Sequence, residues 1–284
     1  MKFGIDKIIE TFELAFDMKK MVFMLVGLII AALGIILNSL VNNVIVGLLG
    51  AIWHYVFLML TLGGVCFLIY QDLKGKGKSS IKDAIDFVKN KAVALIFTPL
   101  VLLLGIALVV LIEFGVVWVL SLIPMLGEIL VALIIIPMLI INVVLAMALF
   151  LGNALIPAII AVDDSGIPAT ITKIFEVVRG APILLISYLF IAMIIATFAV
   201  VGVVLVYVGG LFITVGALYP MLMKVVTTVQ MGAYMGDAIP MSINIAGIIG
   251  GISIGIVTAL VLSFVWVVTQ GIYTAVYMAI KEEV

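Results

Sequence analysis

The chain has 284 residues, of which 67% are hydrophobic and only 10% are charged, with a net charge of -1 and a mean hydropathy of +1.51. These values exclude a soluble globular domain. The apolar runs exceed the ~20 residues that a helix needs to cross a bilayer, and they lack the alternating pattern of outer-membrane barrel strands. We therefore expect residues 1–284 to form one all-α, polytopic transmembrane helical bundle, with the lipid bilayer as its main partner and without nucleic acid.

Residues 1–20 are predicted to form an amphipathic interfacial helix. Apolar side chains recur on one face at helical spacing, and charged side chains occupy the other face. The apolar face comprises Phe3, Ile5, Ile8, Ile9, Phe12, Ala15 and Phe16. The segment lacks the basic cap, short apolar core and small-residue cleavage site of a signal peptide, so we expect it to be retained.

About six to seven spans follow this segment. The first four are predicted at Met21–Leu40, Val44–Tyr70, Ala92–Leu120 and Ile129–Pro157. A fifth follows the polar loop Ala161–Pro182 and ends near Val208, and a sixth covers Leu211–Tyr234. The remaining run, Pro240–Ile280, would measure about 60 Å as one helix, twice the ~30 Å hydrocarbon core. We favour a short interfacial piece at 240–249 followed by one span. The alternative is a re-entrant hairpin that turns at Gly250 and Gly251.

The basic residues predict the orientation. Twelve of the fourteen lie in the N-terminal segment and in two polar loops, Tyr70–Lys91 and Ala161–Pro182. The positive-inside rule makes this side cytoplasmic. We expect a multi-pass protein of the cell membrane with a cytoplasmic N-terminus. Seven spans would put Lys281 outside, whereas a re-entrant tail would put it inside.

The first polar loop contains six of the lysines and is predicted to contact the membrane surface. These are Lys74, Lys76, Lys78, Lys82, Lys89 and Lys91, and three aspartates reduce the charge of the loop to +3. Anionic lipid head groups attract each basic residue near the surface by ~1 kcal/mol. We expect interfacial helices at 79–91 and 168–180, with anionic head groups as partners.

The two polar loops resemble each other, which suggests an internal repeat. A shift of ninety residues superimposes one apolar stripe, Ile81, Ala84, Ile85 and Val88, on another, Ile171, Ile174, Phe175 and Val178. An acidic residue precedes each stripe, at Asp72 and at Asp163, and a span follows it. The pattern indicates repeated hairpins joined by interfacial helices. Alternatively, short amphipathic helices before spans look alike for physical reasons alone.

These loop motifs carry a resemblance that covers most of the chain. One span ends in Tyr70-Gln71-Asp72 and another in Asp163-Asp164; a glycine-containing turn and an amphipathic helix follow, and the second of these helices ends in VVRGAP. The pattern resembles poorly characterised prokaryotic membrane proteins, similar to the membrane domain of some glycerophosphodiester phosphodiesterases. The resemblance implies a helical membrane domain and no catalytic residue. The ratio of thirteen lysines to one arginine is typical of an AT-rich prokaryote, such as an archaeon.

Few side chains suited to catalysis are present. The chain has one histidine, His54, and one cysteine, Cys66, which excludes two-histidine metal sites and internal disulfides. His54 lies between Trp53 and Tyr55 and is interpreted as part of an interfacial aromatic cluster, with a proton-relay or ligand role as the alternative. We predict no catalytic residue, metal site or cofactor, and no enzymatic activity.

Two charges lie within apolar runs, where burial in a bilayer costs ~2.5 kcal/mol or more. Glu113 is predicted near the outer interface, where water solvates it. Lys224 lies near the midplane, shortly after Pro220. It either extends to the interface or contacts an ion or substrate in a cavity between helices broken at Pro99, Pro137 and Pro220.

Glycines at four-residue spacing predict close helix packing. They are Gly247, Gly251 and Gly255 in one run and Gly232 and Gly236 in another. The flat surfaces suit packing within the chain or between subunits, and we expect a homo-oligomer.

Three functions follow from these patterns. The favoured one is a non-enzymatic, self-associating scaffolding protein that shapes the membrane. The alternative is a transporter or channel for a small solute or lipid, with Lys224 in a midplane cavity. An enzyme acting on lipids is disfavoured because clustered catalytic groups are missing.

Overall fold

The computed structural model describes residues 10–11, 13–14, 16–41, 43–75, 80–123, 126–180, 182–191, 193–194, 197–198, 200–210 and 241–281. All regular structure in these residues is helical, which confirms the predicted all-α class. The helices are α2 (Met18–Val41), α3 (Val44–Leu73), α4 (Ile81–Ser121), α5 (Leu126–Met147), the π-helix η1 (Ala148–Gly152), α6 (Asn153–Asp163), α7 (Ile167–Gly180) and α9 (Met241–Lys281). Two shorter apolar helices, Pro182–Ile191 and Val200–Gly210, precede α9.

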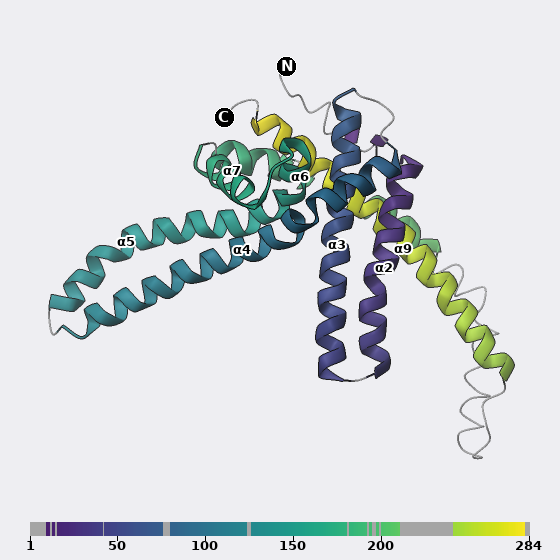
Figure 1. The fold of residues 1–284 in the computed structure, drawn as a ribbon, viewed down its shortest axis with the longest axis horizontal. Coiled ribbons are helices and arrows are strands. Elements are labelled where there is room, and N and C mark those ends of the chain that lie inside the picture. Colours follow the sequence, from purple (N-terminus) through teal and green to yellow (C-terminus); the bar gives the residue numbers. More distant parts are fainter. Residues whose placement is uncertain are drawn as a thin grey trace, which may run out of the picture.

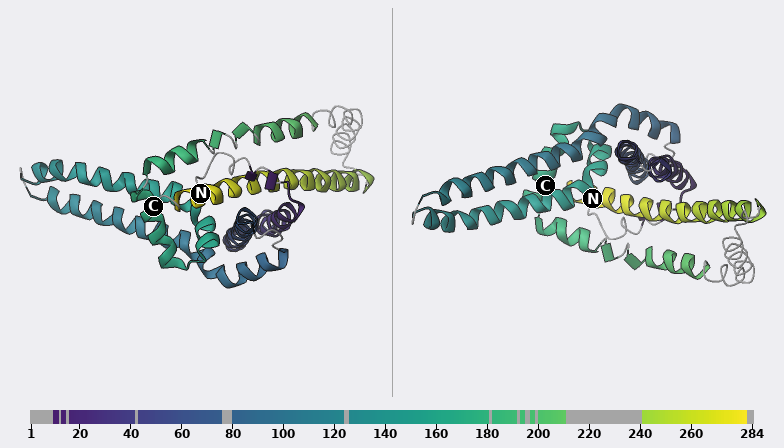
Figure 2. Two further views of the ribbon diagram at one scale, coloured as in Figure 1. Left: turned by 90° about the horizontal axis from the view of Figure 1, so that it is seen from above. Right: turned by 90° about the horizontal axis from the view of Figure 1, so that it is seen from below.

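Three arms radiate from one end of the molecule, here called the hub (Figure 1). The hub contains the starts of α2 and α4, the ends of α3 and α9, and helices α6 and α7. The first arm is the α2–α3 hairpin and the second is the α4–α5 hairpin. The third contains α9, and Figure 2 shows it extending away from the α4–α5 arm. Tyr207 Oη and Thr258 Oγ1, 2.6 Å apart, join Val200–Gly210 to α9.

The α2–α3 arm is closely packed because glycine brings the two backbones together. A Cβ atom on Gly27 would clash with the Thr61 side chain, and one on Gly34 would clash with the carbonyl oxygen of Gly50. Asn43 caps α3, accepting a hydrogen bond from the Ile45 N–H at 2.9 Å. The predicted turn between the first two spans therefore forms a tight hairpin.

Helix α4 joins the predicted interfacial helix at 79–91 and the third span into one continuous helix of 41 residues. Ser80 and Asp83 form a capping box that fixes its start. Ala84 and Phe87 are buried, and the Phe87 ring stacks on Phe67 of α3 at 4.6 Å. The apolar stripe of the lysine-rich loop therefore packs in part against the protein.

The second arm returns to the hub through α5, η1 and α6 without a break in the helical run. The α6 helix ends at Asp163, and the C-cap residue Asp164 adopts a left-handed conformation with φ 52°. Helix α7 follows at an angle of 117° to α6. It occupies nearly the range predicted for the second interfacial helix, 168–180.

Five described helices are long and apolar enough to cross a membrane, or six if the bent pair of α6 and α7 is one span. This agrees with a polytopic membrane protein. The predicted span Leu211–Tyr234 lies outside the described residues. Helix α9 is continuous from Met241 to Lys281, so the alternative of a re-entrant turn at Gly250 and Gly251 is not seen, and residues 241–249 are part of the same helix as the span that follows.

Both chain ends of the described region lie in the hub. Lys281 pairs there with Asp163, and Lys20 pairs with Asp72. Lys281 and Lys20 therefore both lie in the hub.

The core of the molecule is in the hub. The fully buried side chains of α6, including Ile156, Ile159 and Ile160, pack there with those of α3 and α9. By contrast, only Gly127 and Leu145 of α5 are buried. The arms therefore present apolar side chains outward, as expected of helices in hydrocarbon.

Candidate functional site

A cavity of about 460 Å³ lies in the hub, at the point where the arms meet. Its walls come from α3, α4, η1, α6 and α9. Four aromatic side chains line it: Tyr55, Phe150, Trp266 and Tyr273. Two amides, Asn153 and Gln270, also line it. Apolar walls with a few polar groups are typical of small-molecule sites.

Irregular helical geometry shapes one wall of the cavity. The π-helix Ala148–Gly152 places Phe150 on the lining and leads directly into Asn153. Pro157 also lines the cavity, and because it has no N–H it leaves the carbonyl of Asn153 without its usual helical donor. Single π-turns occur frequently at functional sites. The wall therefore combines the aromatic ring of Phe150 with the amide of Asn153.

Some polar groups of the lining are already paired. Tyr55 donates its hydroxyl to the carbonyl oxygen of Ile96 at 2.9 Å, three residues before Pro99. The Gln270 amide oxygen accepts a hydrogen bond from the buried thiol of Cys66, with 3.1 Å between sulfur and oxygen. These contacts connect α3 to α4 and to α9.

Two other polar groups are available to a ligand. Among the described residues, the side chains of Asn153 and Tyr273 form no hydrogen bond with one another or with the rest of the chain. The cavity can therefore hold a mainly apolar molecule and hydrogen-bond its polar end. Within the described part of the chain, no three His, Cys, Asp or Glu side chains converge on one point.

Ion pairs surround the hub and hold its elements together. Lys20 of α2, only 1% exposed, lies 2.8 Å from Asp17 and 2.5 Å from Asp72 at the end of α3. Lys91 of α4 lies 2.8 Å from Asp164.

Asp163 is the centre of another such group. It pairs with Lys281 and also accepts a hydrogen bond from the Tyr277 hydroxyl. Asp72 and Asp163, which precede the two apolar stripes in the sequence, are thus equivalent in role: each binds a lysine of another helix. Sequence reasoning identified these two acids and missed their partners.

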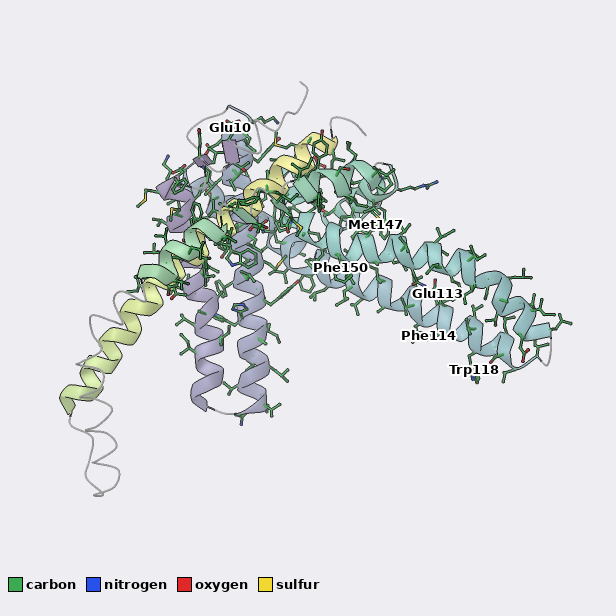
Figure 3. All side chains as sticks on the ribbon, turned by 180° about the vertical axis from the view of Figure 1, so that it is seen from behind. Glu10, Glu113, Phe114, Trp118, Met147 and Phe150 are labelled. Carbon is green, nitrogen blue, oxygen red and sulfur yellow. The ribbon has the colours of Figure 1, made fainter. Side chains whose placement is uncertain are left out.

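Charge is also present in the second arm. Glu113 lies between α4 and α5 (Figure 3), where its Oε2 accepts a hydrogen bond from Asn142 Nδ2 at 2.8 Å. Its Oε1 is buried without a hydrogen-bond partner. Simple solvation of Glu113 is therefore the wrong expectation. An asparagine within an apolar run of the facing helix was the signal that sequence reasoning missed.

The predicted aromatic cluster instead connects helices. Trp53 Nε1 donates to the carbonyl of Ile30 at 2.7 Å, and His54 Nδ1 lies 3.2 Å from the carbonyl oxygen of Ala31. These contacts join α3 to α2. The Nδ1 atom of His54 therefore faces a backbone carbonyl of α2.

Of the predicted surface lysines, Lys74, Lys82 and Lys89 are exposed on the hub, whereas Lys91 is partly buried in its ion pair. Lys76 and Lys78 lie outside the described residues. So does Lys224, the candidate cavity charge. Proline does not break the described helices, because Pro99 and Pro137 lie inside α4 and α5.

Of the predicted packing glycines, the structure describes the surroundings of Gly255 alone. Gly232 and Gly236 lie outside the described residues, and no side-chain environment is described around Gly247 and Gly251. A Cβ atom on Gly255 would meet no described atom within 4 Å. Among the described residues, a Cβ atom would clash with a neighbour at Gly27, Gly34, Gly63, Gly64, Gly127 and Gly152, whose spacings do not form a four-residue series.

In comparisons with protein-family models, with curated proteins and with solved structures, nothing matches this chain.

Proposed function

We propose that this protein is a non-enzymatic membrane scaffold that self-associates and shapes the bilayer. The observation that carries the proposal is the arrangement of three apolar arms that diverge from one charged hub (Figure 1). Because the arms separate towards their tips, the molecule is wider there than at the hub. Lipid or further copies must fill the spaces between the arms, and a wedge of this shape favours a curved membrane.

The charge distribution supports a surface role for the hub. Every described lysine, together with Arg179, lies at the hub end of a helix or in α7. This agrees with a hub on the cytoplasmic face of the cell membrane, in contact with anionic head groups. The resemblance to the membrane domains of some glycerophosphodiester phosphodiesterases belongs to the same proposal, since it also implies a lipid environment.

Reconstitution tests the scaffold. Purified protein is inserted into vesicles of phosphatidylglycerol and phosphatidylcholine at increasing protein-to-lipid ratios, and vesicle diameter is measured by electron cryomicroscopy. We expect narrower vesicles or tubules as the ratio rises, and cross-linked oligomers at the same ratios.

The matched control is the double variant Asp163→Asn, Lys281→Met, which frees the end of α9 from the hub. It should insert equally well and deform vesicles less. Vesicles whose diameter is independent of the protein ratio, with protein that stays monomeric, would show that the proposal is wrong.

A second candidate function is transport of a small solute or lipid. The observation in its favour is the hub cavity with two unpaired polar side chains, Asn153 and Tyr273. Flux through proteoliposomes is compared for the wild type, Asn153→Leu and Lys224→Met. Transport predicts loss of flux in Asn153→Leu with unchanged folding, and loss in Lys224→Met if the lysine reaches the pathway. Absence of flux in the wild type for lipid and for small solutes would remove this candidate.

A further inference from the structure

A helical hairpin followed by an amphipathic helix occurs twice in the structure, and each copy encloses an apolar groove. The first groove, of about 390 Å³, lies between α2, α3 and the start of α4. The second, of about 290 Å³, lies between α4, α5 and α7. Neither belongs to the hub cavity.

The first helix of each hairpin contributes five side chains to its groove with the same spacing. In α2 these are Val22, Phe23, Val26, Gly27 and Ile30. In α4 they are Val101, Leu102, Gly105, Ile106 and Val109. Each residue of the second set lies 79 positions after its counterpart, from 22 to 101 and from 30 to 109. The same face of each helix therefore forms the same wall.

The amphipathic helices form equivalent covers. Ile81 and Ile85 line the first groove, and the residues ninety positions later, Ile171 and Phe175, line the second. Between them, Ala84 is 0% exposed and its counterpart Ile174 is 1% exposed. Similar physical chemistry of short helices explains an apolar stripe. In both copies, in addition, the same two positions line a groove and the same position between them is buried.

A basic residue occupies the same place beside each groove. Lys89 follows Val88, which lines the first groove, and Arg179 lies ninety positions after Lys89, one turn beyond Phe175. Both side chains are exposed. In the described part of the chain neither forms an ion pair, whereas Lys20, Lys91, Lys173 and Lys281 all do. Each groove therefore has apolar walls and, on its covering helix, an exposed basic residue that forms no ion pair with a described residue.

We propose that the two grooves are equivalent binding sites for a hydrocarbon chain of an anionic phospholipid, with its phosphate at Lys89 in one site and at Arg179 in the other. The charge complements a phosphate, and the walls complement a chain. A second copy of the protein fits less well, because two turns of a helix ~10 Å across occupy about 850 Å³, more than twice the volume of either groove. This inference goes beyond the scaffold, since the sites hold individual lipids whether or not the bilayer is reshaped.

The repeat offers matched variants for a test. Val26 and Gly105 are equivalent positions on the groove walls, and both have open space: Val26 is 50% exposed, and no described atom lies within 4 Å of a Cβ built on Gly105. Val26→Trp and Gly105→Trp therefore fill one groove each. Gly115→Trp on the outer part of α4, where a Cβ atom also meets no described atom, is the control.

Native mass spectrometry of the detergent-purified full chain, titrated with phosphatidylglycerol or phosphatidylcholine, measures the outcome. We expect two tightly bound phosphatidylglycerol molecules in the wild type and in Gly115→Trp, one in each groove variant and none in the double variant. Lys89→Gln and Arg179→Gln should each weaken phosphatidylglycerol binding at one site about fivefold and leave phosphatidylcholine binding unchanged.

Circular dichroism and size-exclusion profiles establish that each variant is folded. Two bound lipids in the folded double variant would overturn the proposal. Equal weakening of phosphatidylglycerol and phosphatidylcholine binding by Lys89→Gln would also overturn it. So would cross-linking of the groove residues to a second copy of the protein, which would show that protein and not lipid occupies the grooves.

Discussion

The α2–α3 and α4–α5 arms leave the same hub but are held together in different ways. In the first arm, Gly34 packs against the backbone of Gly50 and Gly27 against the side chain of Thr61, and Trp53 and His54 make hydrogen bonds with carbonyls of the facing helix. In the second arm, a side-chain hydrogen bond from Asn142 to Glu113 joins α5 to α4.

The difference shows what replaces the hydrophobic effect when both helices are already in an apolar medium. Burial of leucine against leucine gains little there, so helices associate through close packing or through polar groups that have no better partner. The first arm uses mainly close packing, and the second relies on a polar pair. Substitutions should therefore affect the arms separately, except in the hub that they share.

The largest effect is expected from Lys20→Met, because Lys20 lies in the hub from which both arms extend. The Lys20 ammonium is buried between Asp17 and Asp72, and its loss leaves both carboxylates unpaired. Because both carboxylates stay partly open to water, the loss should lie at the lower end of the range for a broken buried pair, about 3 kcal/mol. Thermal unfolding in detergent, followed by circular dichroism, measures the change. The control is Lys19→Met, one residue earlier and exposed, for which we expect less than about 0.5 kcal/mol. Equal midpoints for the two variants would contradict the role given to Lys20.

Gly34→Ala should disturb the first arm alone. The new methyl group meets the carbonyl oxygen of Gly50, and a backbone atom cannot turn aside as a side chain does. Overpacking of this kind costs about 1–3 kcal/mol. Hydrogen exchange should increase in α2 and α3 and stay unchanged in α5. The control, Gly115→Ala, places its methyl group in open space and should leave both arms as they are.

Asn142→Leu should loosen the second arm alone. It removes the donor to Glu113 and leaves both carboxylate oxygens without a partner, at a cost of about 0.6–1.7 kcal/mol. Spin labels at the exposed positions Val119 and Leu133 should report a wider and broader distance distribution between α4 and α5. Asn142→Gln, which keeps the donor, should restore most of the native distribution. An unchanged distribution in Asn142→Leu would mean that the pair does not hold this arm.

Acid should produce the smallest effect, at the base of the first arm. Partial burial of Asp17 favours its neutral form, but hydrogen bonds from the Lys20 side chain and the Lys19 backbone outweigh this and hold the pKa of Asp17 below 3.8. Because the pKa is lower in the folded state, the ionised group stabilises the fold above the unfolded value, and this is lost as pH falls through the folded value.

The loss should be less than about 1 kcal/mol, because Asp17 is partly open to solvent and screened. Thermal midpoints measured downward from about pH 5 should show the decline begin near the unfolded pKa. Asp17→Asn should reduce the slope of that decline. A slope identical to that of the wild type would exclude Asp17 as a contributor.

Local patterns in the sequence predicted much of the fold. Long apolar runs located α2, α3, α4 and α5, and the stripes of apolar residues located the start of α4 and helix α7. The alternative turn at Gly250 and Gly251 is absent from α9, because in hydrocarbon a helix satisfies every backbone group and a glycine pair is a weak reason to interrupt it. Spans of this kind are predictable because bilayer thickness and backbone hydrogen bonding act on each segment separately.

The candidate site was less predictable, because its parts come from different segments. Nothing local distinguishes Asn153 and Gln270 from other polar residues in apolar runs, and only the fold brings both to one cavity. Similarly, Asp163 was identified from its position before an amphipathic helix, whereas its partner Lys281 lies more than a hundred residues away. Close packing at Gly34 likewise depends on which residue of α3 faces it.

The buried thiol of Cys66 has a practical consequence. It is the single cysteine of the chain, it is 0% exposed, and it lies at the junction of the first arm with α9, bonded to Gln270. Its rate of reaction with a maleimide dye therefore reports how often the first arm and α9 separate in the wild-type chain. The rate of Cys66 modification in the native protein thus measures how often the hub opens. It can be followed in detergent, in vesicles or in whole cells without an engineered label.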